Sequence, residues 1–328
     1  MTHERIDVGV IGVGTMGQHH ARVYNEIPGA NLVGVSDLDE ARARDVASKY
    51  DTEALDRDAL LAAADAVSVV VPTRCHYEMI ATCLDADVAT LVEKPVIEDL
   101  SRADELRSRV ASAEVPVQVG HIERFNPAVS ELERIIRDLS IVSLRAQRLG
   151  PPITRELGDN IVYDLMIHDI DVLLSLIRSE PVEIAATGVR GNRHSSALVE
   201  FDNGVMASLT ASRKTQRKVR TLEITAEECF IELDYLDKSI EIYRNSVPEY
   251  IERNGDVRFK HESIIERPTV PNVEPLRREL ESFLEVTATN GTPDVSVQDG
   301  LNALSVALEI EAKTAESATS ELANLGDD

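Results

Sequence analysis

The first 120 residues alternate between short apolar runs and longer segments with helical periodicity. Helical spacing is found near residues 39–50, 57–64, 75–85 and 101–112, and in a segment that starts just after residue 14. Strand-like apolar runs include 6–11, 31–35, 66–71, 88–92 and 116–120. Six strands alternating with helices are typical of an α/β fold with a doubly wound parallel sheet, so we assign residues 1–120 to an N-terminal domain of this kind.

After residue 120 the pattern changes. A helix at 127–138, a strand at 141–149, an irregular loop at 150–159 and an apolar helix at 161–177 precede short β-type segments at 184–189, 197–201, 205–211, 219–225, 229–233 and 239–242. They predict an α+β domain, residues 121–318, with an open, largely antiparallel sheet. We expect an extended, charged loop at 245–272, closing helices at 273–290 and 296–316, and a flexible tail at 319–328.

A glycine-rich turn links the first strand to the first helix. Gly12, Gly14 and Gly17 form G-x-G-x-x-G: the first makes the turn, the second lets a pyrophosphate approach, and the third allows close helix packing. The helix begins beside Thr15 and Met16, and its partial positive charge would face the phosphates. The pattern predicts a Rossmann-type dinucleotide-binding domain.

The next two strand ends extend this expected cofactor site. Asp37 lies twenty residues after Gly17, where a carboxylate binds ribose hydroxyls and repels a 2′-phosphate, which favours NAD over NADP. The alternative is a solvated loop aspartate. At the following strand end, Pro72, Thr73 and His76 would bind the cofactor. Thr73 and His76 would touch the nicotinamide ribose, although an N-cap explains Thr73 equally well.

The segment Glu93-Lys94-Pro95 follows the apolar run 88–92. If that run is a parallel strand, its carboxyl end lies where α/β sheets bind ligands, so Lys94 and Glu93 would stand at the mouth of the cofactor crevice. We expect Lys94 to contact both cofactor and substrate.

The apolar helix at 161–177 carries a second candidate group. Asp164, His168 and Asp171 are spaced four and three residues apart and would share a helix face. A carboxylate one turn from a histidine fixes its tautomer and raises its basicity. We therefore expect Asp164 and His168 to converge with Lys94 on one substrate; the alternative is a core histidine flanked by surface aspartates.

Spacing disfavours a metal site. His19 and His20 are adjacent and point about 100° apart on a helix, so packing or capping explains them better. His168, Asp169 and Asp171 have suitable side chains, but Asp169 would point away from the shared face. We expect no metal.

Charge and cysteine content limit the function classes. The chain has 58 acidic against 34 basic residues, a net charge of −24, which disfavours nucleic acids and anionic membranes as partners. Such a surface would suit a high-salt cytosol, where salt screens self-repulsion. Three cysteines without zinc spacing, no signal-peptide pattern and no apolar run of roughly 20 residues predict a cytoplasmic, reduced protein. A basic run at 213–220 is either a solvated hairpin end or an anion clamp.

Three motifs in this order resemble the Gfo/Idh/MocA family of oxidoreductases: Gly12-x-Gly14-x-x-Gly17, Glu93-Lys94-Pro95 and Asp164-x-x-x-His168-x-x-Asp171. The resemblance covers residues 5 to 315. It implies an NAD(P)-dependent enzyme that oxidises or reduces a carbon of a sugar, cyclitol or sugar nucleotide and forms a homodimer or homotetramer through its second-domain sheets. It also implies that Lys94, Asp164 and His168 form the active site.

Within the family, residues 120–127 and 215–220 are similar to the UDP-N-acetylglucosamine 3-dehydrogenase branch. That similarity implies a 3-keto sugar nucleotide as product, with the basic run near the pyrophosphate. The candidate substrate residues are His121, Arg124, Asn126, Asp171 and Lys218. Met166 departs from the family pattern, in which a glycine often stands there, and would narrow the pocket.

For the reaction we assign His168 as general base, Asp164 as its orienting partner and Lys94 as the donor to the developing alkoxide. Lys94 as the base is an open alternative, because burial near a positive nicotinamide would lower its pKa from about 10.4. Two other functions compete: a dehydrogenase of free cyclitols or aldoses, and a catalytically silent regulator that binds NAD or a sugar.

Overall fold

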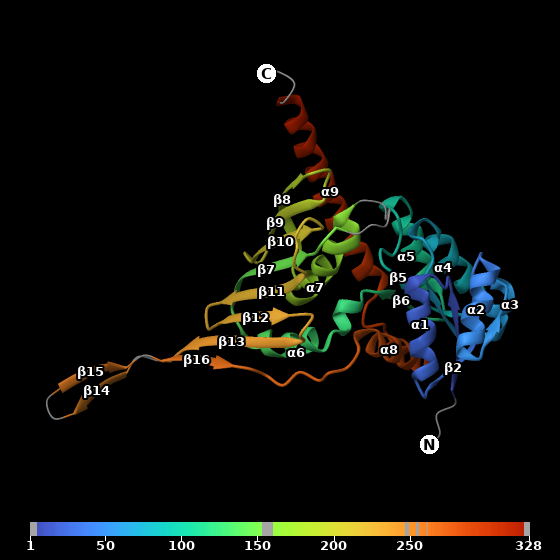
Figure 1. Cartoon of the computed structure of the whole chain (residues 1–328), viewed down its shortest axis with the longest axis horizontal. Helices are drawn as coiled ribbons and strands as arrows, with labels where there is room; N and C mark the ends of the chain where they lie inside the picture. Colours follow the sequence, from blue (N-terminus) through green and yellow to red (C-terminus); the bar gives the residue numbers. More distant parts are fainter. Residues whose placement is uncertain (1–4, 153–159, 247–248, 254–255, 261, 325–328) are drawn as a thin grey trace. The chain divides into compact units, whose positions relative to one another are not determined.

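The computed structural model describes residues 5–152, 160–246, 249–253, 256–260 and 262–324. The chain forms two compact units: Met1–Phe125 with Val273–Ser305, and Asn126–Asn272 with Val306–Asp328 (Figure 1). Within the described residues, no helix is both long enough and apolar enough to cross a membrane.

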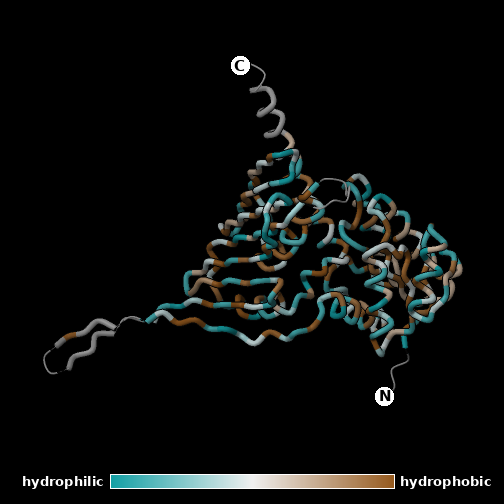
Figure 2. Tube along the Cα trace, in the orientation of Figure 1, coloured by the Kyte–Doolittle hydropathy of each residue, from teal (hydrophilic) through white to brown (hydrophobic). Residues whose placement is uncertain are grey.

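The first unit is built on a six-stranded parallel sheet. Its strands are β1 (Ile6–Ile11), β2 (Ala30–Ser36), β3 (Glu53–Ala54), β4 (Ala66–Val69), β5 (Ala89–Glu93) and β6 (Val117–Gly120), in the order β3-β2-β1-β4-β5-β6. This is the order of doubly wound dinucleotide-binding sheets, which reverses between β1 and β4. β4 and β6 are buried throughout because helices cover both faces. In Figure 2 the apolar positions of this unit concentrate along its strands.

The helices that connect these strands are α1 (Thr15–Glu26), α2 (Glu40–Tyr50), α3 (Arg57–Ala63), α4 (His76–Asp85) and α5 (Ala103–Ser112), with 3-10 turns η1 (Thr73–Cys75), η2 (Leu100–Arg102) and η3 (Ile122–Phe125). Side-chain caps start two of these α-helices: Asp39 accepts a hydrogen bond from the Arg42 amide, and Asp56 accepts one from the Ala59 amide.

The division of the chain differs from the predicted boundary at residue 120. Helix α8 (Pro275–Thr289) belongs to the first unit, because its apolar face, including Leu280 and Phe283, is buried in the same core as β1 and α1. Helix α9 (Val297–Asn324) begins in the first unit and continues in the second. It also runs past residue 318, so the backbone is helical where a flexible tail was expected to begin.

The second unit contains an eight-stranded sheet in the order β16-β13-β12-β11-β7-β10-β9-β8. Its only parallel pair among the described strands is β7 with β10; the others are antiparallel, which confirms the predicted largely antiparallel sheet. The strands are β7 (Ile141–Leu149), β8 (Pro181–Val189), β9 (His194–Phe201), β10 (Met206–Ser212), β11 (Val219–Ala226), β12 (Phe230–Asp234), β13 (Ser239–Asn245) and β16 (Ser263–Glu266).

The prediction of an extended loop at 245–272 is wrong. β16 extends the sheet beside β13, and β14 (Glu249–Arg253) pairs with β15 (Asp256–Lys260) as a separate two-stranded ribbon. Polar and apolar residues alternate along 256–260, which is a strand pattern that the high charge of the segment obscured. Of the loop expected at 150–159, residues 153–159 lie outside the described part of the chain.

Helices cover one face of this sheet. α6 (Pro127–Ile135), followed by η4 (Ile136–Asp138), contacts β12 and β13. α7 (Ile167–Ile177) contacts β7 and β10, and is preceded by the π-helical turn η5 (Val162–Met166). Buried and accessible residues alternate along β7, so its other side chains point to the uncovered face.

Candidate active site

The three glycines of the first turn have the surroundings that the sequence predicted. Gly12 adopts φ +90°, and a side chain there would collide with the carbonyl of Val70. A side chain at Gly17 would collide with the carbonyl of Gly12, whereas nothing lies within 4 Å of the Cβ position of Gly14. The turn is therefore closed on two sides and open at Gly14, where α1 begins with the exposed Thr15 and the half-buried Met16. These features fit a bound pyrophosphate.

Asp37 closes the same turn at the end of β2. Its Oδ2 accepts a hydrogen bond of 2.8 Å from the Val13 amide, and its Oδ1 accepts from the amide of Asp39 and from Arg42, the latter at 3.0 Å. Its side chain is only 10% exposed, so Asp37 is not a solvated loop residue. The sequence analysis did not identify Arg42. It could have been found as a basic residue in the first turn of the helix that follows Asp37.

The loop after β4 differs in detail from its prediction. Pro72, not Thr73, precedes η1, and Thr73 is the half-buried first residue of that turn. His76 is buried, with Nδ1 2.8 Å from the carbonyl oxygen of Pro95 and Nε2 2.9 Å from that of Val71. Burial lowers the pKa of His76 despite these acceptors. His76 thus ties two strand-end loops together, and its contact with the nicotinamide ribose stays a prediction.

Register places Glu93 and Lys94 at the same sheet edge as the glycine turn. Ile11 of β1 pairs with Val69 of β4, which pairs with Val92 of β5, so the residues after these three leave adjacent parallel strands side by side. Glu93 ends β5 and Lys94 is half-buried. This is the position that the sequence predicted for Lys94 within the first unit.

The candidate substrate residues near β6 have structural contacts. His121 is buried, and its amide donates to the Val119 carbonyl. Arg124 donates to the carbonyl of Asp294 at 3.4 Å. In the second unit, Asn126 is buried as the N-cap of α6, accepting from Ala128 at 3.1 Å, and donates to the Tyr235 carbonyl at 3.3 Å. Capping accounts for the residue type at Asn126.

Asp164 and His168 lie on either side of a change in helix type. The sequence predicted one regular helix over 161–177, but Asp164 lies in the π-helical turn η5 and His168 in the first turn of α7. Such turns insert an extra residue and occur often at functional sites. Both side chains are partly accessible, whereas Asp171 is buried.

The segment after β10 supplies a partner for Asp164. The Arg213 guanidinium forms an ion pair with the Asp164 carboxylate. Burial lowers the pKa of Arg213, while the later basic residue Lys218 is exposed. The predicted basic run therefore has one end beside a candidate catalytic carboxylate. The sequence analysis identified the basic run as a possible anion clamp but did not single out Arg213.

Asp169 points from α7 toward the sheet. Its two carboxylate oxygens accept hydrogen bonds of 2.8 Å and 2.7 Å from Arg148 of β7, and both side chains are 3% exposed. This buried pair fixes α7 one residue after His168. No three His, Cys, Asp or Glu side chains in the described ranges are arranged to hold a metal ion.

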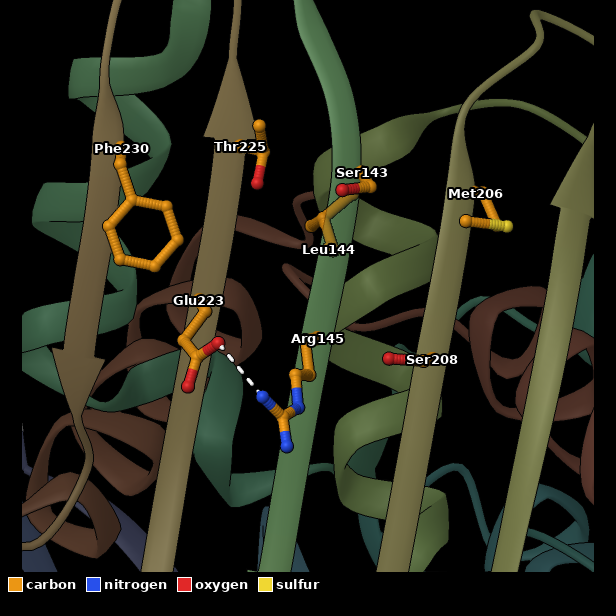
Figure 3. Close-up of a pocket in the computed structure, with 8 residues that line it drawn as sticks. All are labelled: Ser143, Leu144, Arg145, Met206, Ser208, Glu223, Thr225 and Phe230. Atoms are coloured by element: carbon orange, nitrogen blue, oxygen red, sulfur yellow. Dashed lines mark ion pairs between the residues drawn. The ribbon is translucent and has the colours of Figure 1, made fainter.

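The uncovered face of the second-unit sheet carries a separate hollow of about 180 Å³. Its lining comes from β7, β10, β11 and β12, with Arg145 and Glu223 paired at 3.6 Å (Figure 3). Arg145 and Arg148 are three residues apart on one strand, so they point to opposite faces. The hollow is therefore on the face away from α7 and does not belong to the site of His168.

The sheet order, glycine turn and strand-end acid define a Rossmann protein that binds a nicotinamide dinucleotide. Family models agree: an oxidoreductase family with an NAD-binding Rossmann fold matches residues 6–121, and the GFO/IDH/MocA C-terminal domain matches residues 141–232. The chain belongs to the GFO/IDH/MocA family of oxidoreductases, as its motifs indicated.

Individual relatives extend over nearly the whole chain. The UDP-N-acetylglucosamine 3-dehydrogenase of Acidithiobacillus ferrooxidans is 33% identical, covering 94% of this chain and 97% of its own. A structure of that enzyme superposes with a TM-score of 0.85 at 31% identity, covering 95% of this chain and 99% of the other. The inositol 2-dehydrogenase of Rhizobium meliloti is 28% identical over 91% of this chain and 94% of its own.

Proposed function

We propose that the protein oxidises a hydroxyl carbon of a nucleotide sugar with NAD, and that its substrate is UDP-N-acetylglucosamine, oxidised to the 3-keto product. The observation that carries this proposal is the 33% identity, over 94% of the chain, to the enzyme of that activity from Acidithiobacillus ferrooxidans. The inositol 2-dehydrogenase of Rhizobium meliloti shares less identity, 28%, over a similar length.

The residues of the first unit fit NAD. Gly14 leaves room for the pyrophosphate at the start of α1, and the Asp37 carboxylate offers acceptors to the ribose hydroxyls while repelling a 2′-phosphate. When bound, NAD supplies the nicotinamide carbon that accepts a hydride from the sugar. Thr15, Met16, Pro72 and Thr73 complete the proposed cofactor site.

The proton of the sugar hydroxyl goes to a side chain of this protein. We assign His168 as the base that takes this proton, Asp164 as the carboxylate that orients it, and Lys94 as the donor that stabilises the alkoxide until the carbonyl forms. The accessible His168 and the strand-end position of Lys94 support these roles. Lys94 as the base remains the alternative.

Basic side chains of the run at 213–220 support an anionic substrate. Arg213 is paired with Asp164, and Lys218 is exposed in the same basic run. A guanidinium binds phosphate oxygens in a bidentate manner, so we assign the diphosphate of the nucleotide sugar to this run. His121, Arg124 and Asp171 are lower-ranked candidates for substrate contact.

Inositol or a free sugar is the second candidate substrate, favoured by the 28% identity to the Rhizobium meliloti inositol dehydrogenase. NADH formation is therefore measured with UDP-sugars, free sugars and inositols in parallel. We expect turnover with UDP-N-acetylglucosamine and little with inositol. The reverse result would reject the nucleotide-sugar assignment, and binding of NADH without turnover of any substrate would favour a silent regulator.

We also propose that the uncovered sheet face joins copies of the chain into a homodimer or homotetramer. Leu198 of β9 and Met206 of β10, on neighbouring strands, alternate with buried residues and are 44% and 45% exposed. Exposed apolar side chains on one face are typical of an interface. Sedimentation of Leu198→Glu against the parent tests this: an unchanged oligomer would exclude this face as the interface.

Cys75, Cys83 and Cys229 are free thiols, which supports the proposal that the protein works in the cytoplasm.

A further inference from the structure

Buried polar side chains that the proposed reaction does not use form a continuous hydrogen-bonded chain in the first unit. The Tyr24 hydroxyl lies 2.9 Å from Ser68 Oγ, which lies 3.0 Å from His20 Nδ1. His20 Nε2 lies 3.2 Å from Glu93 Oε1, and the other oxygen of Glu93 accepts from the Lys94 amide at 3.2 Å. The chain therefore leads from the helix of the cofactor turn to the backbone amide of Lys94, whose charged side chain also interacts electrostatically with the Glu93 carboxylate.

The donors give this chain a direction. Each hydroxyl carries one proton, so every atom is satisfied when Tyr24 donates to Ser68, Ser68 to His20 Nδ1, and His20 Nε2 to Glu93. A doubly protonated His20 also donates from Nε2, so Glu93 receives this hydrogen bond in both states. The His20 side chain is fully buried and that of Glu93 is 15% exposed, so little water reaches the carboxylate.

The surroundings hold Glu93 tightly. A Cβ atom at Gly120 of β6 would lie 3.2 Å from the Cα and 3.4 Å from the carboxyl carbon of Glu93, so β6 packs closely against this residue. Burial acts to raise the pKa of Glu93, but the hydrogen bond and charge of His20 and the charge of Lys94 lower it on balance. The titratable groups facing Glu93 are His20 of α1, Lys94 after β5 and His76 of α4, and Glu279 faces Tyr24 at the far end.

We propose that His20 is a positioning residue for Lys94: its hydrogen bond keeps the Glu93 carboxylate oriented and ionised, and that carboxylate keeps the Lys94 ammonium charged. The inference rests on the proposed function in one respect only, namely that the Lys94 charge stabilises the alkoxide of the substrate. His20 lies three residues after Gly17, so the helix that begins at the cofactor turn also carries the residue that contacts Glu93, next to Lys94. Without an ionised Glu93, the ammonium loses a neutralising neighbour and gives up its proton at lower pH.

The test measures the protonation of Lys94 without any substrate. The pH midpoint for acylation of Lys94 by an amine-specific reagent is followed by peptide mass spectrometry, with Lys49 as internal reference. His20→Leu should lower the midpoint, and a midpoint lower by about one pH unit makes the reactive fraction at a given pH about tenfold larger. His20→Gln keeps an amide donor near Nε2 and should keep the parental midpoint. Tyr24→Phe removes the hydroxyl at the far end and should melt earlier without moving the midpoint.

An unchanged midpoint in His20→Leu would overturn the proposal, as would equal changes in the Leu and Gln variants, which indicate general disruption. If His20→Leu does not fold, Glu93→Gln replaces it, and an unmoved midpoint there has the same meaning. Turnover measured alongside separates the two ideas. If the parent oxidises no sugar but His20→Leu still lowers the Lys94 midpoint, only the proposed function is wrong. If the parent is active but His20→Leu leaves the Lys94 midpoint unchanged, only the role proposed for His20 is wrong.

Discussion

Breaking the buried ion pair between Arg148 and Asp169 should destabilise the second unit far more than breaking an exposed pair in the same unit. Both side chains are 3% exposed, and both carboxylate oxygens are hydrogen-bonded, at 2.8 Å and 2.7 Å. Asp169→Leu leaves the guanidinium buried without its counter-charge. Removing one partner of a buried pair costs about 3–5 kcal/mol.

The control is Arg134→Met on α6, outside the proposed interface. Arg134 is 71% exposed and lies 2.8 Å from Glu131, an exposed pair worth about 0–1 kcal/mol. The double variant Arg148→Met with Asp169→Leu should regain most of the loss, because an apolar pair carries no unpaired charge. Urea unfolding followed by circular dichroism measures all three. A loss below about 1 kcal/mol for Asp169→Leu would refute the reasoning, since it would equate the buried pair with an exposed one.

Three further outcomes are expected. Lys94→Ala and His168→Ala should each lower turnover at least about a hundredfold while NADH binding, followed by fluorescence, persists; parental turnover in either would reject its assigned role. Asp37→Ala should weaken NAD and relax the rejection of NADP in paired binding titrations, and because Asp37 also holds the Val13 amide, both cofactors should lose some affinity; an unchanged NAD/NADP ratio would contradict the assignment. The net pKa of Glu93 is lowered on folding, so its stabilising contribution is present above the unfolded pKa of about 4.3 and is lost as pH falls through the folded value. Glu93→Gln should therefore melt earlier than the parent at neutral pH, with the difference shrinking in acid; a constant difference would exclude this linkage.

Local signals in the sequence determined the first unit up to β6. The glycine spacing reflects two local requirements, a positive φ at Gly12 and close packing at Gly17. The apolar runs reflect burial on both faces of the sheet. The acid after β2 marks a strand end. Such requirements can be read one segment at a time. The sheet edge that carries Lys94 followed directly, because parallel strands in one sheet end at the same side.

What the sequence could not determine depended on partners distant along the chain. Residues 273–305 belong to the first unit because the apolar face of α8 completes the core beneath β1, and that core is defined only once α1 and the sheet exist. The ion pair of Asp164 with Arg213 joins residues 49 positions apart, and the link from His20 to Glu93 joins residues 73 positions apart. Periodicity states which face of an element is apolar; only tertiary packing decides which polar side chains meet behind it.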